Sequence, residues 1–170
     1  MRKPFAELIF NFIYGIDKEE LQKIGLERTN YRIFSGLYII ENARILKSEI
    51  PKIRKKLLEI TSNEKFDTEI QVYAQKVYDS FDKVRKMPKV PFNRLIISFI
   101  YGVNQKSLEE IGLARNSYRI FAGIYLLKNV TVSKEAIMKY EAELRAMSSN
   151  QKFSHEIRDY SKKVLKSFIA

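Results

Sequence analysis

The sequence predicts an all-α protein that consists of two tandem repeats of about five helices each. Apolar residues recur three or four positions apart along most of the 170 residues, and no segment alternates apolar and polar residues as a strand would. The chain also aligns with itself at an offset of 87 residues, with about 35 of 80 positions identical and no gap. With 45% hydrophobic and 30% charged residues, the composition is that of a globular protein rather than a disordered one. We therefore expect two copies of one helical fold.

The self-alignment defines the domain organisation. It predicts helical repeats at residues 4–83 and 91–170, with residues 84–90 as a linker in which Pro88 disfavours helix at Met87. Because both repeats share one fold, we expect them to form a pseudo-symmetric unit, a single-chain version of a homodimer. The longest shared motifs are Phe12-Ile13-Tyr14-Gly15 with Phe99-Ile100-Tyr101-Gly102, and Tyr31-Arg32-Ile33-Phe34 with Tyr118-Arg119-Ile120-Phe121.

The first two helices of each repeat have clear start and stop signals. Residues 5–14 carry apolar side chains at helical spacing, and Gly15 follows at the position where a left-handed residue ends a helix. Asp17, with Glu20 three residues later, resembles a capping box that opens a short helix extending to Ile24. Asn104 takes the capping position in the second repeat.

Three longer helices complete the repeat. An apolar helix is predicted from Arg28 or Thr29 to about Asn42. Ser48 in the first repeat, or Ser133 in the second, is predicted to cap the fourth helix. Pro51 lies in the first turn of that helix, where its missing N–H costs nothing, and Ser62-Asn63 ends it. The last helix is amphipathic and is predicted to be capped by Asp67 or Ser154.

Within each repeat, the second and third predicted helices form a recurring pattern. When Gly25 is placed at the turn of the segment 18–37, every position that must be buried is apolar or aromatic. This segment, and its copy in the second repeat, resembles the helix-turn-helix superfamily of DNA-binding domains over about 20 residues. The buried positions are Leu21, Ile24, Leu26, Tyr31 and Phe34, and Leu108, Ile111, Leu113, Tyr118 and Phe121.

The resemblance implies which residues would face the major groove of DNA. In both repeats two arginines stand four residues apart, so that two guanidinium groups would lie on one stripe, suited to guanine edges or phosphates. Gly36 and Gly123 fall on the same implied face. The candidate DNA-binding residues are Arg28, Thr29, Arg32, Arg115, Asn116 and Arg119.

The charge balance is compatible with a nucleic-acid partner. The chain has 31 Lys and Arg against 20 Asp and Glu, a net charge of +11, and its pI is near 9.7. Residues 1–85 carry +3 and residues 86–170 carry +8, so we expect the second repeat to make more of the phosphate contacts. We therefore predict binding of double-stranded DNA, by a transcription regulator or an architectural protein, at half-sites about 34 Å apart.

Other features exclude several classes of function. The chain has no cysteine and a single histidine, His155, so thiolate chemistry and histidine-rich metal sites are excluded. It has no glycine-rich phosphate loop, and we expect no enzymatic activity, no cofactor and no bound metal. Scattered carboxylates leave a Mg²⁺-dependent nuclease open.

The hydropathy pattern predicts a cytoplasmic protein. The longest apolar runs, residues 33–40 and 120–127, are far shorter than the roughly 20 residues that span a bilayer. The N-terminus, Met-Arg-Lys-Pro-Phe, lacks the apolar stretch of a secretory leader. We expect no membrane partner, and assembly of identical chains stays open.

Three alternatives to DNA binding are considered besides the nuclease. The first is a helical protein–protein interaction scaffold with no nucleic-acid partner, whose positive charge only guides an acidic protein. The second is an RNA-binding protein that stacks exposed Tyr and Phe rings on bases. The third is a histone-like wrapper, which Gly25 and residues 48–51 disfavour because they interrupt the chain where that fold has one long central helix. Exposure of the four arginines on one face would favour DNA, whereas their burial would favour the scaffold.

Overall fold

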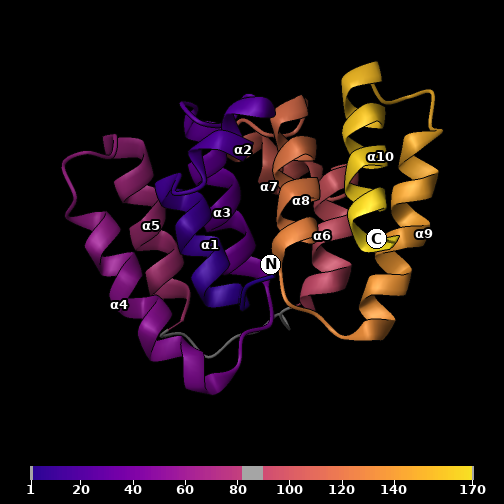
Figure 1. Ribbon diagram of the computed structural model, residues 1–170. Helices are drawn as coiled ribbons and strands as arrows, with labels where there is room; N and C mark the ends of the chain where they lie inside the picture. Colours follow the sequence, from indigo (N-terminus) through magenta and orange to yellow (C-terminus); the bar gives the residue numbers. More distant parts are fainter. Residues whose placement is uncertain (1, 82–89, 170) are drawn as a thin grey trace. The chain divides into compact units, whose positions relative to one another are not determined.

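The computed structural model describes residues 2–81 and 90–169, and these residues are helical almost throughout (Figure 1). They contain ten α-helices, one 3₁₀ helix (η1, Lys47–Glu49) and no strand beyond two isolated bridges, so the predicted all-α class is confirmed. No helix in this described part is long and apolar enough to cross a bilayer. The α-helices are α1 (Phe5–Tyr14), α2 (Lys18–Lys23), α3 (Asn30–Asn42), α4 (Ile50–Thr61), α5 (Thr68–Ser80), α6 (Phe92–Tyr101), α7 (Gln105–Glu110), α8 (Ser117–Asn129), α9 (Lys134–Ser148) and α10 (His155–Ile169).

The predicted local signals for the first three helices are confirmed. Gly15 has φ +69° directly after α1, in the left-handed region that glycine adopts without strain. The side chain of Asp17 accepts from the backbone N–H of Glu20 at the start of α2, and Asn104 accepts from Ser107 at the start of α7. Thr29 is the N-cap of α3, as one of the two predicted alternatives requires.

The start of the fourth helix differs between the repeats. Ser133 caps α9 as predicted, accepting from the N–H of Ala136 at 3.2 Å. Ser48 does not cap α4 but lies in η1, so this prediction is wrong. A serine cap accepts from the second or third helical N–H, which here would be those of Ile50 and Pro51. Pro51 has no N–H, and the N–H of Ile50 donates to the carbonyl oxygen of Lys47.

The last helices also begin differently. Ser154 Oγ accepts from the N–H of Ile157 at 3.3 Å, which confirms Ser154 as a cap of α10. Asp67 occupies the N-cap position of α5 but makes no capping bond. Its Oδ2 instead accepts from Nδ2 of Asn30 at 2.6 Å, which ties the start of α5 to the start of α3.

The residues group into two compact units. Unit 1 is Met1–Leu8 with Ile96–Ala170, and unit 2 is Ile9–Leu95, so the divisions fall inside α1 and α6. The predicted linker, residues 84–90, is not where the units divide, and residues 84–89 lie outside the described part of the chain.

Each unit contains one short backbone pairing. In unit 1, Lys3 pairs with Val130, with bonds from Lys3 N to Asn129 O at 2.7 Å and from Thr131 N to Lys3 O at 2.8 Å. In unit 2, Val90 pairs with Ala43, at positions 87 residues from those two. The segment before each repeat therefore pairs with the end of the third helix of the other repeat.

The core of each unit surrounds one apolar helix, α3 in unit 2 and α8 in unit 1. Nearly every residue from Arg32 to Ile40 is buried, as is the matching stretch of α8. Helices α4 and α5 pack together in unit 2, and α9 and α10 pack together in unit 1. The third helix of each repeat is thus a core helix along most of its length.

Candidate nucleic-acid interface

Arg32 is 7% exposed, and its guanidinium is used inside unit 2. Nη1 donates to the carbonyl oxygens of Leu26, at 2.9 Å, and Glu27, while Nη2 donates to that of Ile13 at 3.0 Å. Ile13 is in the last turn of α1, whose carbonyls have no partner within the helix and favour a cation. Burial lowers the pKa of Arg32, and the nearby Glu27 partly opposes that shift.

Arg119 occupies the same place in unit 1. Its Nε and Nη2 donate to the carbonyl oxygens of Phe99 and Ile100 at 2.8 and 3.1 Å. Its Nη1 donates to those of Leu113 and Ala114 at 2.8 and 2.7 Å. Burial lowers the pKa of this guanidinium too. Both arginines therefore tie the C-terminal end of the first helix of the repeat, α1 or α6, to the turn that precedes the third helix, α3 or α8.

This burial corrects the expectation that Arg32 and Arg119 lie on an exposed stripe with Arg28 and Arg115. Gly36, which the resemblance also places toward the groove of DNA, is buried as well. Helix α1 approaches it so closely that a Cβ there would lie 2.5 Å from Cγ1 of Ile13. The face of α3 that was predicted to read DNA is therefore covered by α1, and only the part of that face in the first turn is accessible.

The other four candidate residues lie at the N-terminal ends of α3 and α8. Thr29 and Asn116 are the N-caps, and their side chains accept from the N–H groups of Tyr31 and Tyr118 at 3.2 and 2.9 Å. The side-chain oxygens of Thr29 and Asn116 are therefore engaged in capping the N-terminal ends of α3 and α8. The DNA-binding role predicted for these residues and for Arg28 and Arg115 stays a prediction.

The two remaining arginines are exposed but have different surroundings. The Arg28 side chain is 93% exposed, and its Nε lies 3.7 Å from Oε1 of Glu27. Arg115 is exposed as well, but Ala114 takes the place of the glutamate. Within the described residues Arg115 makes no ion pair, so its charge is not offset by a bound carboxylate.

Arg115 borders an open groove of about 490 Å³ in unit 1. The groove lies where the first turns of α8 and α10 meet, and Lys152 lines it from the loop before α10. Two helix N-termini and the exposed cations Arg115 and Lys152 make this corner electropositive, and the buried Arg119 also lines it. Among the described residues of the lining, Glu156 is the one carboxylate. The sequence-based choice of residues missed Lys152, although the shared Lys65-Phe66 and Lys152-Phe153 motif was a signal for it.

Comparisons with family models, curated proteins and solved structures find no match for this chain. In the described part of the chain, no group of three or more His, Asp or Glu residues is placed to hold a metal ion.

Proposed function

We propose that this protein binds double-stranded DNA as an architectural or regulatory protein, chiefly through the phosphate backbone. The observation that carries the proposal is the groove in which Arg115 and Lys152 lie beside the N-terminal turns of α8 and α10. Exposed cations at helix N-termini suit phosphate oxygens, and the net charge of +11 attracts the duplex at long range. We expect the protein to encounter this DNA in the cytoplasm.

Burial of the third helices limits how the duplex is contacted. Because Arg32, Arg119 and the body of each helix are inside the units, base reading by an inserted helix is not part of the proposal. Contacts from Arg28, Arg115 and Lys152 would fix the position of the protein without reading base sequence. Weak sequence preference is therefore expected.

Fluorescence anisotropy of a labelled random-sequence duplex, titrated at several salt concentrations, tests the proposal. Micromolar binding with a steep dependence of log Kd on log salt is expected, at about 0.9 per phosphate contact. The double variant Arg115→Gln, Lys152→Gln should lower that slope by about 2. Arg145→Gln, an exposed change on α9, is the control and should leave the slope nearly unchanged. Absence of binding by the unmodified chain at low salt would overturn the proposal.

The second candidate is a helical scaffold that binds another protein and no nucleic acid. Burial of two of the four arginines favours it, and so does an apolar surface present in both units. Ile16 and Val103 occupy equivalent positions and are 63% and 68% exposed. Beside them the rings of Tyr14 and Tyr101 contact Phe66 and Phe153, at 5.5 and 5.7 Å between centroids. Exposed apolar groups in a polar rim are typical of protein contacts, and failure of the duplex titration would favour this function.

A further inference from the structure

The outer face of α10 carries three exposed lysines, Lys162, Lys163 and Lys166. Lys162 and Lys166 are four residues apart and therefore lie on the same side of the helix, about 6 Å apart along its axis. Half-exposed Lys128 lies two turns after Phe121 on α8, and the Phe121 ring contacts Tyr160 of α10, 5.8 Å away. Residues two turns apart share a helix face, so Lys128 is on the side of α8 that meets α10.

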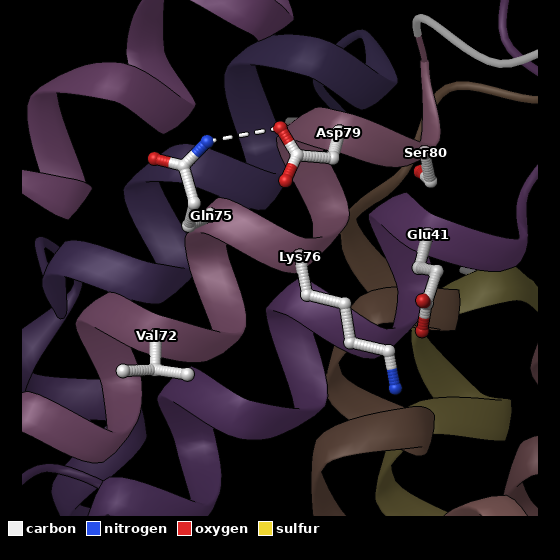
Figure 2. A pocket seen from close by; sticks show the side chains of 6 residues that line it. All are labelled: Glu41, Val72, Gln75, Lys76, Asp79 and Ser80. Carbon is white, nitrogen blue, oxygen red and sulfur yellow. Dashed lines mark hydrogen bonds between the residues drawn. The ribbon is translucent and has the colours of Figure 1, made fainter.

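Unit 2 has a very different surface at the equivalent positions. There an open groove of about 450 Å³ is lined by side chains of α3 and α5 (Figure 2). Nε2 of Gln75 donates to Oδ1 of Asp79 at 3.0 Å, and the hydroxyl of Tyr73 donates to Oε1 of Glu41 at 3.1 Å. The lining residues are Glu41, Val72, Gln75, Lys76, Asp79 and Ser80.

Comparison of the two surfaces locates the charge asymmetry of the chain. The unit 2 surface has two carboxylates and one lysine, a net charge of −1. The equivalent positions of unit 1 have four lysines and one aspartate, a net charge of +3. These six positions account for a difference of four charges, which is most of the difference between +8 and +3 in the two halves. The six unit 1 residues are Lys128, Asp159, Lys162, Lys163, Lys166 and Ser167.

Stability of α10 does not require this cluster. Of the three lysines only Lys166 lies in the last turn, where a cation complements the helix dipole, and like charges four residues apart are mildly destabilising. None of Lys162, Lys163 and Lys166 forms an ion pair with a described residue, and Asp159 does not pair with them either. A bound polyanion would remove the mutual repulsion of these lysines.

We propose that the lysine face of α10, formed by Lys162, Lys163 and Lys166 with Lys128 beside it, is a second phosphate-binding surface for duplex DNA. This proposal rests on the proposed function and names a further part of the DNA contact. Lysine acts as a flexible point charge and carries no base specificity, which suits contacts to the phosphate backbone.

The length of α10 favours a duplex as the occupant. Its 15 residues span about 22 Å from the end near Lys152 to the end near Lys166. A strand of B-DNA presents one phosphate per roughly 3.4 Å of its axis, so this length would cover about six phosphates. The groove at the start of α10 and the lysine face near its end are therefore far enough apart to contact separate phosphates of one duplex.

Exchange of residues between the repeats tests the lysine face in the full chain. Lys162→Gln with Lys166→Asp places the unit 2 residues on the unit 1 face and changes the charge by −3. The reverse exchange, Gln75→Lys with Asp79→Lys, adds +3 to the unit 2 face. The control, Lys139→Glu with Arg145→Gln, also changes the charge by −3 at exposed positions of α9. Circular dichroism and melting curves check that each variant is folded.

The salt dependence of duplex binding is the readout. We expect the unit 1 exchange to reduce the log–log salt slope by about 2, the reverse exchange to increase it, and the control to leave it nearly unchanged. Equal effects of the unit 1 exchange and the control would overturn the proposal, because general charge would then explain both. An unaltered slope in the unit 1 exchange would also overturn it while leaving DNA binding itself in place.

Two further outcomes separate the proposals. If the unmodified chain binds no duplex at low salt, both the lysine face and the proposed function are overturned. If the unit 1 exchange weakens binding only to vesicles of phosphatidylcholine and phosphatidylserine, and not to the duplex, the face binds a lipid surface and the proposal fails.

Discussion

The guanidinium of Arg32 lies directly against Gly15, the residue that ends α1. A Cβ at Gly15 would be 3.0 Å from Cζ of Arg32, and Gly102 has the same relationship to Arg119 in unit 1. The glycine thus has two roles, since its φ of +69° ends the helix and its missing side chain admits the guanidinium to the carbonyl of Ile13. The Gly and Arg that both repeats share form one structural contact.

Removal of either buried arginine should destabilise the protein. Arg32→Ala or Arg119→Ala leaves several carbonyl oxygens without donors, and we expect a loss of about 3 kcal/mol in the free energy of unfolding. Urea unfolding measures this loss, and Arg28→Ala is the exposed control that should change it by less than about 0.5 kcal/mol. A small effect at Arg32 would show that water replaces the guanidinium at no cost.

Gly36 and Gly123 should not tolerate a methyl group. A Cβ would lie 2.5 Å from Cγ1 of Ile13 or 2.3 Å from Cγ1 of Ile100, so Gly→Ala should cost about 1–3 kcal/mol although alanine favours helix.

The neighbouring residue Ser35 supplies a matched control, to be compared with Gly36→Ala by thermal melts. Ser35 is fully buried, its hydroxyl has no hydrogen-bond partner among the described residues, and unit 1 has Ala122 at the same position. Ser35→Ala should therefore be neutral or stabilising. A stabilising Gly36→Ala would contradict the close approach of α1 and α3.

Tyr140 should make stability depend on pH at the alkaline end. It is fully buried on α9, its hydroxyl has no hydrogen-bond partner in the described structure, and burial raises its pKa while Arg2 opposes the shift. An unfolded tyrosine ionises near pH 10, whereas the folded form resists ionisation. This contribution to stability is therefore full below about pH 10 and is lost as the pH rises further.

Tyr140→Phe removes both the ionisation and the unpartnered hydroxyl. We expect a gain of about 1 kcal/mol near pH 7 and a smaller loss of stability between pH 9 and 11 than in the unmodified chain. Melting temperatures across this pH range measure the difference. Tyr14 and Tyr101 also have pKa values raised by burial, but they are present in both proteins and cancel in the comparison. Parallel curves for the two proteins would remove Tyr140 as the cause.

The two exposed arginines should contribute unequally to duplex binding. Glu27 lies 3.7 Å from Arg28 and repels phosphate, whereas Ala114 leaves the charge of Arg115 unopposed. Arg115→Gln should therefore raise Kd more than Arg28→Gln in the same anisotropy titration. In addition, Glu27→Ala should strengthen binding through Arg28. Equal losses at the two arginines would contradict the asymmetry.

The local organisation of the chain could be predicted from the sequence, because it depends on neighbours a few residues away. Asp17 reaches the N–H of Glu20, and Gly15 adopts a positive φ, without help from distant parts of the chain. The failed cap at Ser48 is local as well, since the missing N–H of Pro51 was visible in the sequence. Helix periodicity also showed which face of each element is apolar.

The place of the charged residues was decided by contacts between distant segments. Arg32 has the sequence environment of an exposed groove-facing arginine, yet it is buried because the carbonyl of Ile13, 19 residues earlier, is brought beside it. The pairing of Lys3 with Val130 joins the start of the chain to the second repeat, which a repeat boundary drawn from similarity does not show. Pattern and propensity act over one or two turns, whereas the burial of a cation depends on which unpaired carbonyls the packed helices bring to it.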